Sequence, residues 1–220
     1  MLRVDSAAPG RPPRAWRRAW PLAAALLLLL APRSGATTVR PQNLADLVGL
    51  SETIVIGTVE KVTDGFDARG IPFTEVTIRV GENIRGASGD TLSFRQFGLL
   101  KPRVIDGRRY LGVSPDGWPS WHERERVMVF LGRPAKQTGL RTTVGLGQGK
   151  MQVLDGKLAN SARNAGLFRK LQITAPSLTS AQQAMLQTDR TPVDAGAFVS
   201  LVRRAVNENW TEKGMMRHAD

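Results

Sequence analysis

His122 is the residue whose neighbours come closest to a reactive arrangement. It stands in the run WHERER beside Glu123 and Glu125, and a histidine next to carboxylates can bind a metal or act as a general base. The spacing differs from the helical HExxH pattern of zinc proteases, and the second histidine, His218, is almost at the end of the chain. We therefore expect no metal site here, and we retain His122 only as a candidate binding residue.

The other short motifs do not match a known catalytic arrangement. The run GLGQGK at residues 145–150 has too few residues between its glycines for a phosphate-binding loop, and Met151 replaces the required Ser or Thr. Ser114 is followed directly by Pro115, which does not fit a nucleophile elbow. The chain has no cysteine, so thiolate zinc sites, cysteine nucleophiles and disulfides are excluded. We predict a protein that is not an enzyme and that uses no cofactor.

Residues 98–125 form a long stretch without periodicity, which contains three prolines and combines cations with aromatic rings. Long insertions of this kind in compact domains are more often functional than required for packing. Such side chains occur in protein interfaces, and they also bind anionic polymers by charge and stacking. Alternatively, the tryptophans cover one end of the fold and the cations are merely solvated. The candidate binding residues are Lys101, Arg103, Arg108, Arg109, Tyr110, Trp118, Trp121 and His122.

The segments around this stretch have the pattern of β-strands. In residues 73–85, Val76, Ile78 and Val80 alternate with polar residues, and residues 53–62 are the expected hairpin partner. A strand is predicted at 126–131, because Arg126 is followed by a continuously apolar run at 127–131, which is typical of a central strand buried on both faces. Further strands are expected at 91–97, 140–145 and 150–154, with a tight turn at 155–156 leading to 157–158.

Helical patterns lie at the two ends of this region. A short helix is predicted at 42–49, and others at 162–171 and 177–188. A last helix is capped by Asp194, and residues 210–220 are expected to fray.

The number and length of these strands predict a mainly β fold. We expect a small closed antiparallel barrel of the OB type over residues 37–158, with 98–125 inserted, followed by a helical extension at 159–220. A β-sandwich is the alternative.

Residues 1–36 have the features of a secretory signal peptide. Several arginines precede the apolar run at 20–31, and small residues follow at 34–36. The run is too short for an ordinary membrane span, although an uncleaved anchor is the alternative. The first 36 residues hold six Arg and one Asp, so cleavage would lower the net charge from +12 by 5, to +7. We therefore expect a moderately basic protein that is secreted or periplasmic, with no membrane span after cleavage.

The order of these segments resembles a known group. The runs IVIGTV at 54–59, VTIRV at 76–80, VMVFL at 127–131 and VGLGQGK at 144–150 are similar to those of uncharacterised bacterial secreted proteins with an OB/netrin-like barrel. That group is similar in layout to the tissue inhibitors of metalloproteinases. The resemblance implies a barrel and a protein partner, with a metalloprotease as one candidate. The inhibitors chelate zinc through an N-terminal cysteine, which this chain lacks, so their mechanism does not carry over.

Two functions of different class follow from these patterns. The first is a secreted, non-enzymatic protein that presents residues 98–125 to an exported protein, with a protease as the candidate class. The alternative is a binder of an anionic polymer, either nucleic acid or glycan.

Overall fold

A computed structural model describes residues 42–105, 107–110 and 117–219, which all belong to one compact unit. The signal peptide predicted at 1–36 lies outside the described residues. Of the helices in the described part, none has the length and apolar character that crossing a membrane requires.

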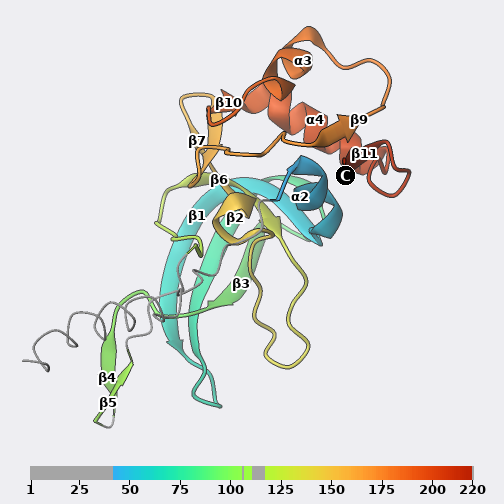
Figure 1. Cartoon of the computed structure of the whole chain (residues 1–220). Coiled ribbons are helices and arrows are strands. Elements are labelled where there is room, and N and C mark those ends of the chain that lie inside the picture. Colours follow the sequence, from blue (N-terminus) through green and yellow to red (C-terminus); the bar gives the residue numbers. More distant parts are fainter. Residues whose placement is uncertain (1–41, 106, 111–116, 220) are drawn as a thin grey trace, which may run out of the picture. The chain divides into compact units, whose positions relative to one another are not determined.

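A seven-stranded antiparallel sheet organises the fold (Figure 1). Its strand order is β10-β8-β7-β6-β1-β2-β3, so β6 is the middle strand, as predicted. The hairpin of β1 and β2 is also confirmed, and both of its strands extend beyond the predicted ranges. The strands are β1 (Thr53–Phe66), β2 (Pro72–Arg85), β3 (Thr91–Phe97), β6 (Arg126–Leu131), β7 (Lys150–Leu154), β8 (Lys157–Asn160) and β10 (Val193–Asp194).

The sheet is not closed, so the prediction of a closed barrel is wrong, whereas the prediction of a mainly β fold is confirmed. Both β3 and β10 are sheet edges. The remaining described strands form two separate two-stranded sheets, β4 (Arg103–Ile105) with β5 (Arg108–Tyr110), and β9 (Leu171–Ile173) with β11 (Met216–His218). The described residues therefore do not form two large facing sheets either.

The segment at 140–145, which was predicted to be a strand, explains why the sheet does not close into a barrel. This segment makes only an isolated bridge, Thr143 to Leu131, before the 3-10 helix η1 (Leu146–Gly149). The N–H of Arg141 donates to the carbonyl of Arg95 on β3, at 2.7 Å. Gly145 and Leu146 then have left-handed φ values of 64° and 55°, which turn the chain out of an extended path. An irregular segment thus touches both β6 and β3 where a continuous strand would close the sheet.

The sheet is buried on both faces along β6 and the first half of β1, which explains the apolar runs of these strands. One face carries a cluster of Val55, Val59, Val76, Ile78, Phe94, Trp121, Val127, Val129 and Leu131. The other face contributes Ile54, Ile56, Met128 and Phe130 to a larger core that is shared with the helices. The predicted inward orientation of Val76 and Ile78 is confirmed.

Helix α4 (Ala195–Asn207) supplies most of the helical side of that core. Asp194 caps it as predicted, because its Oδ1 accepts a 2.9 Å hydrogen bond from the N–H of Ala197. Phe198, Leu201 and Val202 are completely buried. Helix α3 (Ser180–Leu186) lies within the predicted range 177–188. Residues 159–220 therefore share a core with the sheet.

The helix predicted at 162–171 is wrong, because this segment is a series of turns that ends in β9. Asn160 Oδ1 accepts hydrogen bonds from the N–H groups of Ala162 and Asn164, at 3.0 and 2.8 Å. Asn164 in turn donates to the carbonyls of Leu158 and Thr191, both at 2.9 Å. These side chains satisfy the backbone locally and so compete with a helix.

The fraying predicted for 210–220 is also wrong. Trp210 is completely buried, and Met216 is 1% exposed. Strand β11 pairs with β9, so the end of the chain is held by a ladder as well as by the core.

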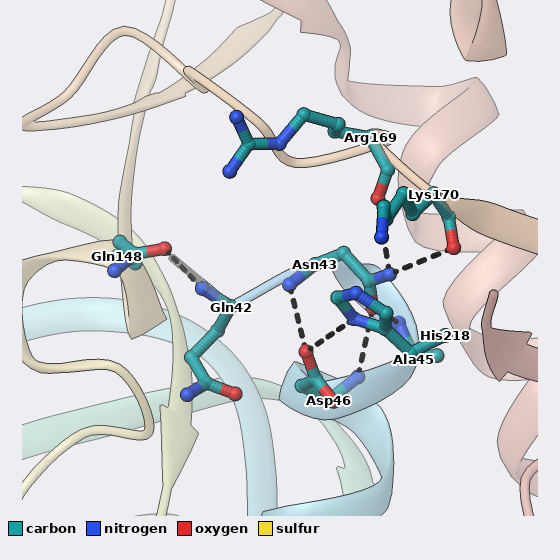
Figure 2. A network of polar contacts seen from close by, with 8 residues as sticks. All are labelled: Gln42, Asn43, Ala45, Asp46, Gln148, Arg169, Lys170 and His218. Atoms are coloured by element: carbon teal, nitrogen blue, oxygen red, sulfur yellow. Dashed lines mark hydrogen bonds and ion pairs between the residues drawn. The ribbon is translucent and has the colours of Figure 1, made fainter. Parts of the chain in front are cut away.

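The predicted first helix, α2 (Leu44–Leu50), is confirmed, and its cap joins distant parts of the chain. Figure 2 shows Asn43 donating through Nδ2 to the carbonyls of Arg169 and Lys170, at 3.1 and 3.3 Å. Its Oδ1 accepts from the first turn of the helix. Asp46 Oδ2 accepts from the N–H of Asn43 and lies 3.2 Å from Nδ1 of His218 on β11. His218 therefore belongs to a structural network.

Candidate functional site

The candidate site lies in and around residues 98–125, which follow the edge strand β3. The segment contains the short ribbon of β4 and β5, which Figure 1 shows apart from the seven-stranded sheet. Residues 106 and 111–116 lie outside the described residues, as do the side chains of Arg108 and Tyr110, although both of these candidates are on β5.

The three candidate cations with described side chains, Lys101, Arg103 and Arg109, are exposed. Arg103 pairs with Asp64 near the end of β1. Asp64 also accepts a 2.7 Å hydrogen bond from the N–H of Leu100, and its side chain is only 5% exposed. This carboxylate thus attaches the segment to the main sheet and leaves Lys101 and Arg109 facing solvent.

Three large apolar side chains within eight residues of the sequence are exposed. Phe97 is 39% exposed, Leu100 45% and Val104 66%. We call these three residues, with Lys101 and Arg103 between them, the 97–104 patch. Among the described residues only two other large apolar side chains are exposed to this degree, and they lie elsewhere in the sequence: Leu50 and Leu154. Exposed apolar residues that cluster, in contrast to scattered ones, are typical of interaction surfaces.

The two candidate tryptophans have different roles. Trp118 is half-buried, and its ring meets that of Phe97 edge-on with centroids 6.4 Å apart, so it borders the patch. Trp121 is only 4% exposed, and its Nε1 donates to Oε1 of Gln96 at 2.9 Å. Its ring also packs edge-on against Phe94, with centroids 5.4 Å apart. Trp121 therefore belongs to the core, and it does not lie on the surface where a binding residue was expected.

A cavity of about 560 Å³ adjoins Trp118. The side chains of Trp118 and His122 line it, together with residues from β7, β8 and η1. Two of the candidate binding residues, Trp118 and His122, therefore line the same cavity. His122 is exposed, and its Nδ1 lies 2.8 Å from Oε1 of Glu125.

A half-buried ion pair, Glu125 with Lys150, also lines this cavity. Lys150 Nζ also donates to the carbonyl of Ser120 at 2.5 Å and lies 4.9 Å from the centroid of the Trp121 ring. Burial alone would raise the pKa of Glu125, but hydrogen bonds from Lys150 and His122 outweigh it, so the pKa is held below its ordinary value. The carboxylate is thus kept ionised and occupied, which suits a structural charge pair better than a general base.

Sequence reasoning missed this pair. The sequence places Lys150 only in the GLGQGK run and at the start of the strand expected at 150–154, and it places Glu125 only beside His122. Within the described residues no three His, Asp or Glu side chains come together in a way that could hold a metal ion.

No protein-family model matches the chain, and no curated protein matches it. The resemblance to netrin-like proteins therefore remains a prediction, and the site has to be interpreted from its own geometry.

Proposed function

We propose that this chain is an exported, non-enzymatic binding protein that engages another exported protein through the 97–104 patch. The observation that carries the proposal is the exposure of Phe97, Leu100 and Val104 within eight residues beside a sheet edge. An apolar centre with a polar surround is the usual composition of a protein interface.

The charge around the patch indicates what kind of surface the partner presents. Residues 97–110 contain four cations and one carboxylate, Asp106. An apolar contact surrounded by positive charge is complementary to a partner whose apolar pocket is bordered by Asp and Glu. We therefore propose an acidic exported protein as the partner.

The attachment of the patch to the main sheet supports a binding role. Asp64 pairs with Arg103 and accepts from the N–H of Leu100, so two residues of the patch are tied to β1. A segment held before binding loses less conformational entropy on association than a free loop does.

A protease remains the candidate class of partner, and the netrin-like resemblance supports a metalloprotease in particular. Because the chain has no cysteine, it would inhibit such an enzyme by covering its surface and not by chelating zinc through a cysteine. Export and cleavage are tested separately. N-terminal sequencing of the exported protein should begin at Thr37.

The test of binding uses the full chain with a C-terminal tag, expressed in the producing cell and cross-linked in the exported fraction. The double variant Leu100→Ser with Val104→Ser should lose the cross-linked protein, which mass spectrometry then identifies. Leu50→Ser is the matched control, since it removes an equally exposed apolar side chain elsewhere.

Retention of the same partner by the double variant would contradict the proposed surface. The anionic-polymer alternative would be favoured if nucleic acid or glycan were captured instead. Its affinity should then fall steeply as salt rises and should be the same for the double variant as for the wild type.

A further inference from the structure

A second cavity lies on the side of the sheet that α4 covers, away from residues 98–125 in the sequence. Its volume is about 660 Å³, within the range of small-molecule sites. It is lined by residues of β1, β2, β6, β7 and the first two turns and a half of α4.

Small residues line this cavity from the two facing elements. Gly57 on β1 and Gly81 on β2 line it where the register of the hairpin shifts. Ala195 and Gly196 line it from the start of α4. A Cβ on Gly81 would meet only the carbonyl oxygen of Ile56, at an ordinary contact distance of 3.5 Å, so there is room for a side chain at this position.

The cavity has an apolar surface on both sides. Ile56 and Val80 contribute from the hairpin, Val153 from β7 and Val199 from α4. Gly196, Val199 and Arg203 have the spacing of one helical stripe, so α4 presents a continuous flank to the space. This flank is distinct from Phe198, Leu201 and Val202, which are buried in the core.

The lining of this cavity carries more positive than negative charge. Three arginines line the cavity, whereas Glu82 is its only carboxylate. Glu82 pairs with Arg203, whose Nε lies 2.7 Å from its Oε1, and Arg79 pairs with Glu60 at 3.3 Å. For Arg126, no carboxylate in residues 42–105, 107–110 and 117–219 lies within ion-pair distance. Its exposed guanidinium is available for a ligand.

We propose that this cavity binds an alkyl carboxylate, with the carboxylate on Arg126 and the alkyl chain against the apolar lining. Arg126 offers two parallel N–H donors that match a carboxylate, and the neighbouring cations concentrate negative charge at the same opening. A ligand with an apolar body would occupy the room beside Gly81 and contact the valine side chains. A bare inorganic anion would leave those side chains in contact with water.

The test is calorimetric titration of the full chain with decanoate, below its micelle concentration and at low salt. Decanol and decyltrimethylammonium are the matched probes, with the same chain and a neutral or positive head. We expect decanoate to bind at least tenfold more tightly than decanol, and the ammonium compound not to bind.

Three variants locate the site. Arg126→Gln should weaken decanoate binding about tenfold and remove the preference over decanol. Gly81→Leu should abolish binding by filling the space, while Arg133→Gln, which removes an exposed arginine outside the lining, should leave it unchanged. A urea midpoint equal to that of the wild type shows that each variant is folded.

Equal binding of the three probes, or unchanged decanoate binding by both Arg126→Gln and Gly81→Leu, would overturn the proposal. Inorganic phosphate that binds as tightly as decanoate would show a site for the anion alone and would also overturn it. The outcome is independent of the partner surface, because Leu100→Ser with Val104→Ser leaves this cavity intact.

Discussion

The ammonium group of Lys150 lies over the ring of Trp121, 4.9 Å from its centroid, and pairs at the same time with Glu125. Lys150 is the first residue of β7, whereas the other two belong to the end of the 98–125 segment. The contact therefore fixes that end of the segment to the sheet. It also gives the half-buried Glu125 a charged partner, which burial of a carboxylate requires.

Lys150→Met should destabilise the protein, because it keeps much of the side-chain volume but leaves Glu125 without its ion-pair partner. A buried hydrogen-bonding group that loses its partner costs about 1–3 kcal/mol. Urea denaturation at pH 7 measures the change. Lys157→Met is the control, since the Nζ of Lys157 is 3.9 Å from Asp194 in an exposed pair, and we expect a change of less than about 1 kcal/mol there.

The lowered pKa of Glu125 makes its contribution depend on pH. The folded-state pKa is below the ordinary value of 4.5, so the stabilisation is fully present above pH 4.5 and is lost as the pH falls through the folded-state pKa. The difference in free energy of unfolding between the wild type and Glu125→Gln should therefore be largest near neutral pH and should shrink below pH 4.5. Urea denaturation across this range measures it. A difference that grows on acidification would contradict the assigned direction.

Trp121→Ala should cost about 3–5 kcal/mol, as is usual for removing a large buried aromatic side chain. Trp121→Phe should cost less, because it keeps a ring against Phe94 and loses mainly the hydrogen bond to Gln96. Trp118→Ala, at the half-buried neighbour, is the comparison and should be the milder of the two alanine variants. Equal losses for the two alanine variants would mean that Trp121 is not the core residue described here.

Parts of the fold that depend on local periodicity could be predicted from the sequence. The alternation in 73–85 identifies β2 because it records which face of the strand is buried. The apolar run at 127–131 identifies β6 because both faces of that strand are buried. The capping side chains of α2 and α4 likewise act within one turn.

The remaining errors arise where distant contacts decide the outcome. Residues 162–171 have a helical composition, but hydrogen bonds of Asn160 and Asn164 hold them in turns. The last residues look like a free end, yet Trp210 is buried in a core that includes Ile54 and Ile56 of β1, more than a hundred residues away in the sequence. At the candidate site, tryptophan type alone could not separate Trp121 from Trp118, because burial depends on the packing against Phe94.

Gly57→Ala should be strongly destabilising, because a Cβ there would lie 2.2 Å from the carbonyl oxygen of Arg79 and 2.6 Å from Cγ2 of Ile78. Backbone on a central hairpin cannot move away cheaply, so we expect a loss of about 1–3 kcal/mol. Gly81→Ala, on the paired strand, is the matched control. Its Cβ meets only an ordinary contact of 3.5 Å, so its urea midpoint should be equal to or slightly above that of the wild type.

Asn43 joins α2 to two distant segments, so its removal should cost more than the loss of a helix cap (Figure 2). An ordinary cap contributes about 1 kcal/mol. Asn43 is 1% exposed, and Asn43→Ala also leaves the carbonyl of Arg169 without the donor that Nδ2 supplies, so we expect a loss of about 2–4 kcal/mol. Asn43→Ser can still accept from the first turn and should recover about 1 kcal/mol of that loss. Thr179→Ala, which removes the cap of α3 alone, supplies the value for a cap without distant partners. If urea denaturation gives the same loss for Asn43→Ala and Thr179→Ala, the hydrogen bonds to 169 and 170 contribute nothing measurable, and α2 is held by its apolar face alone.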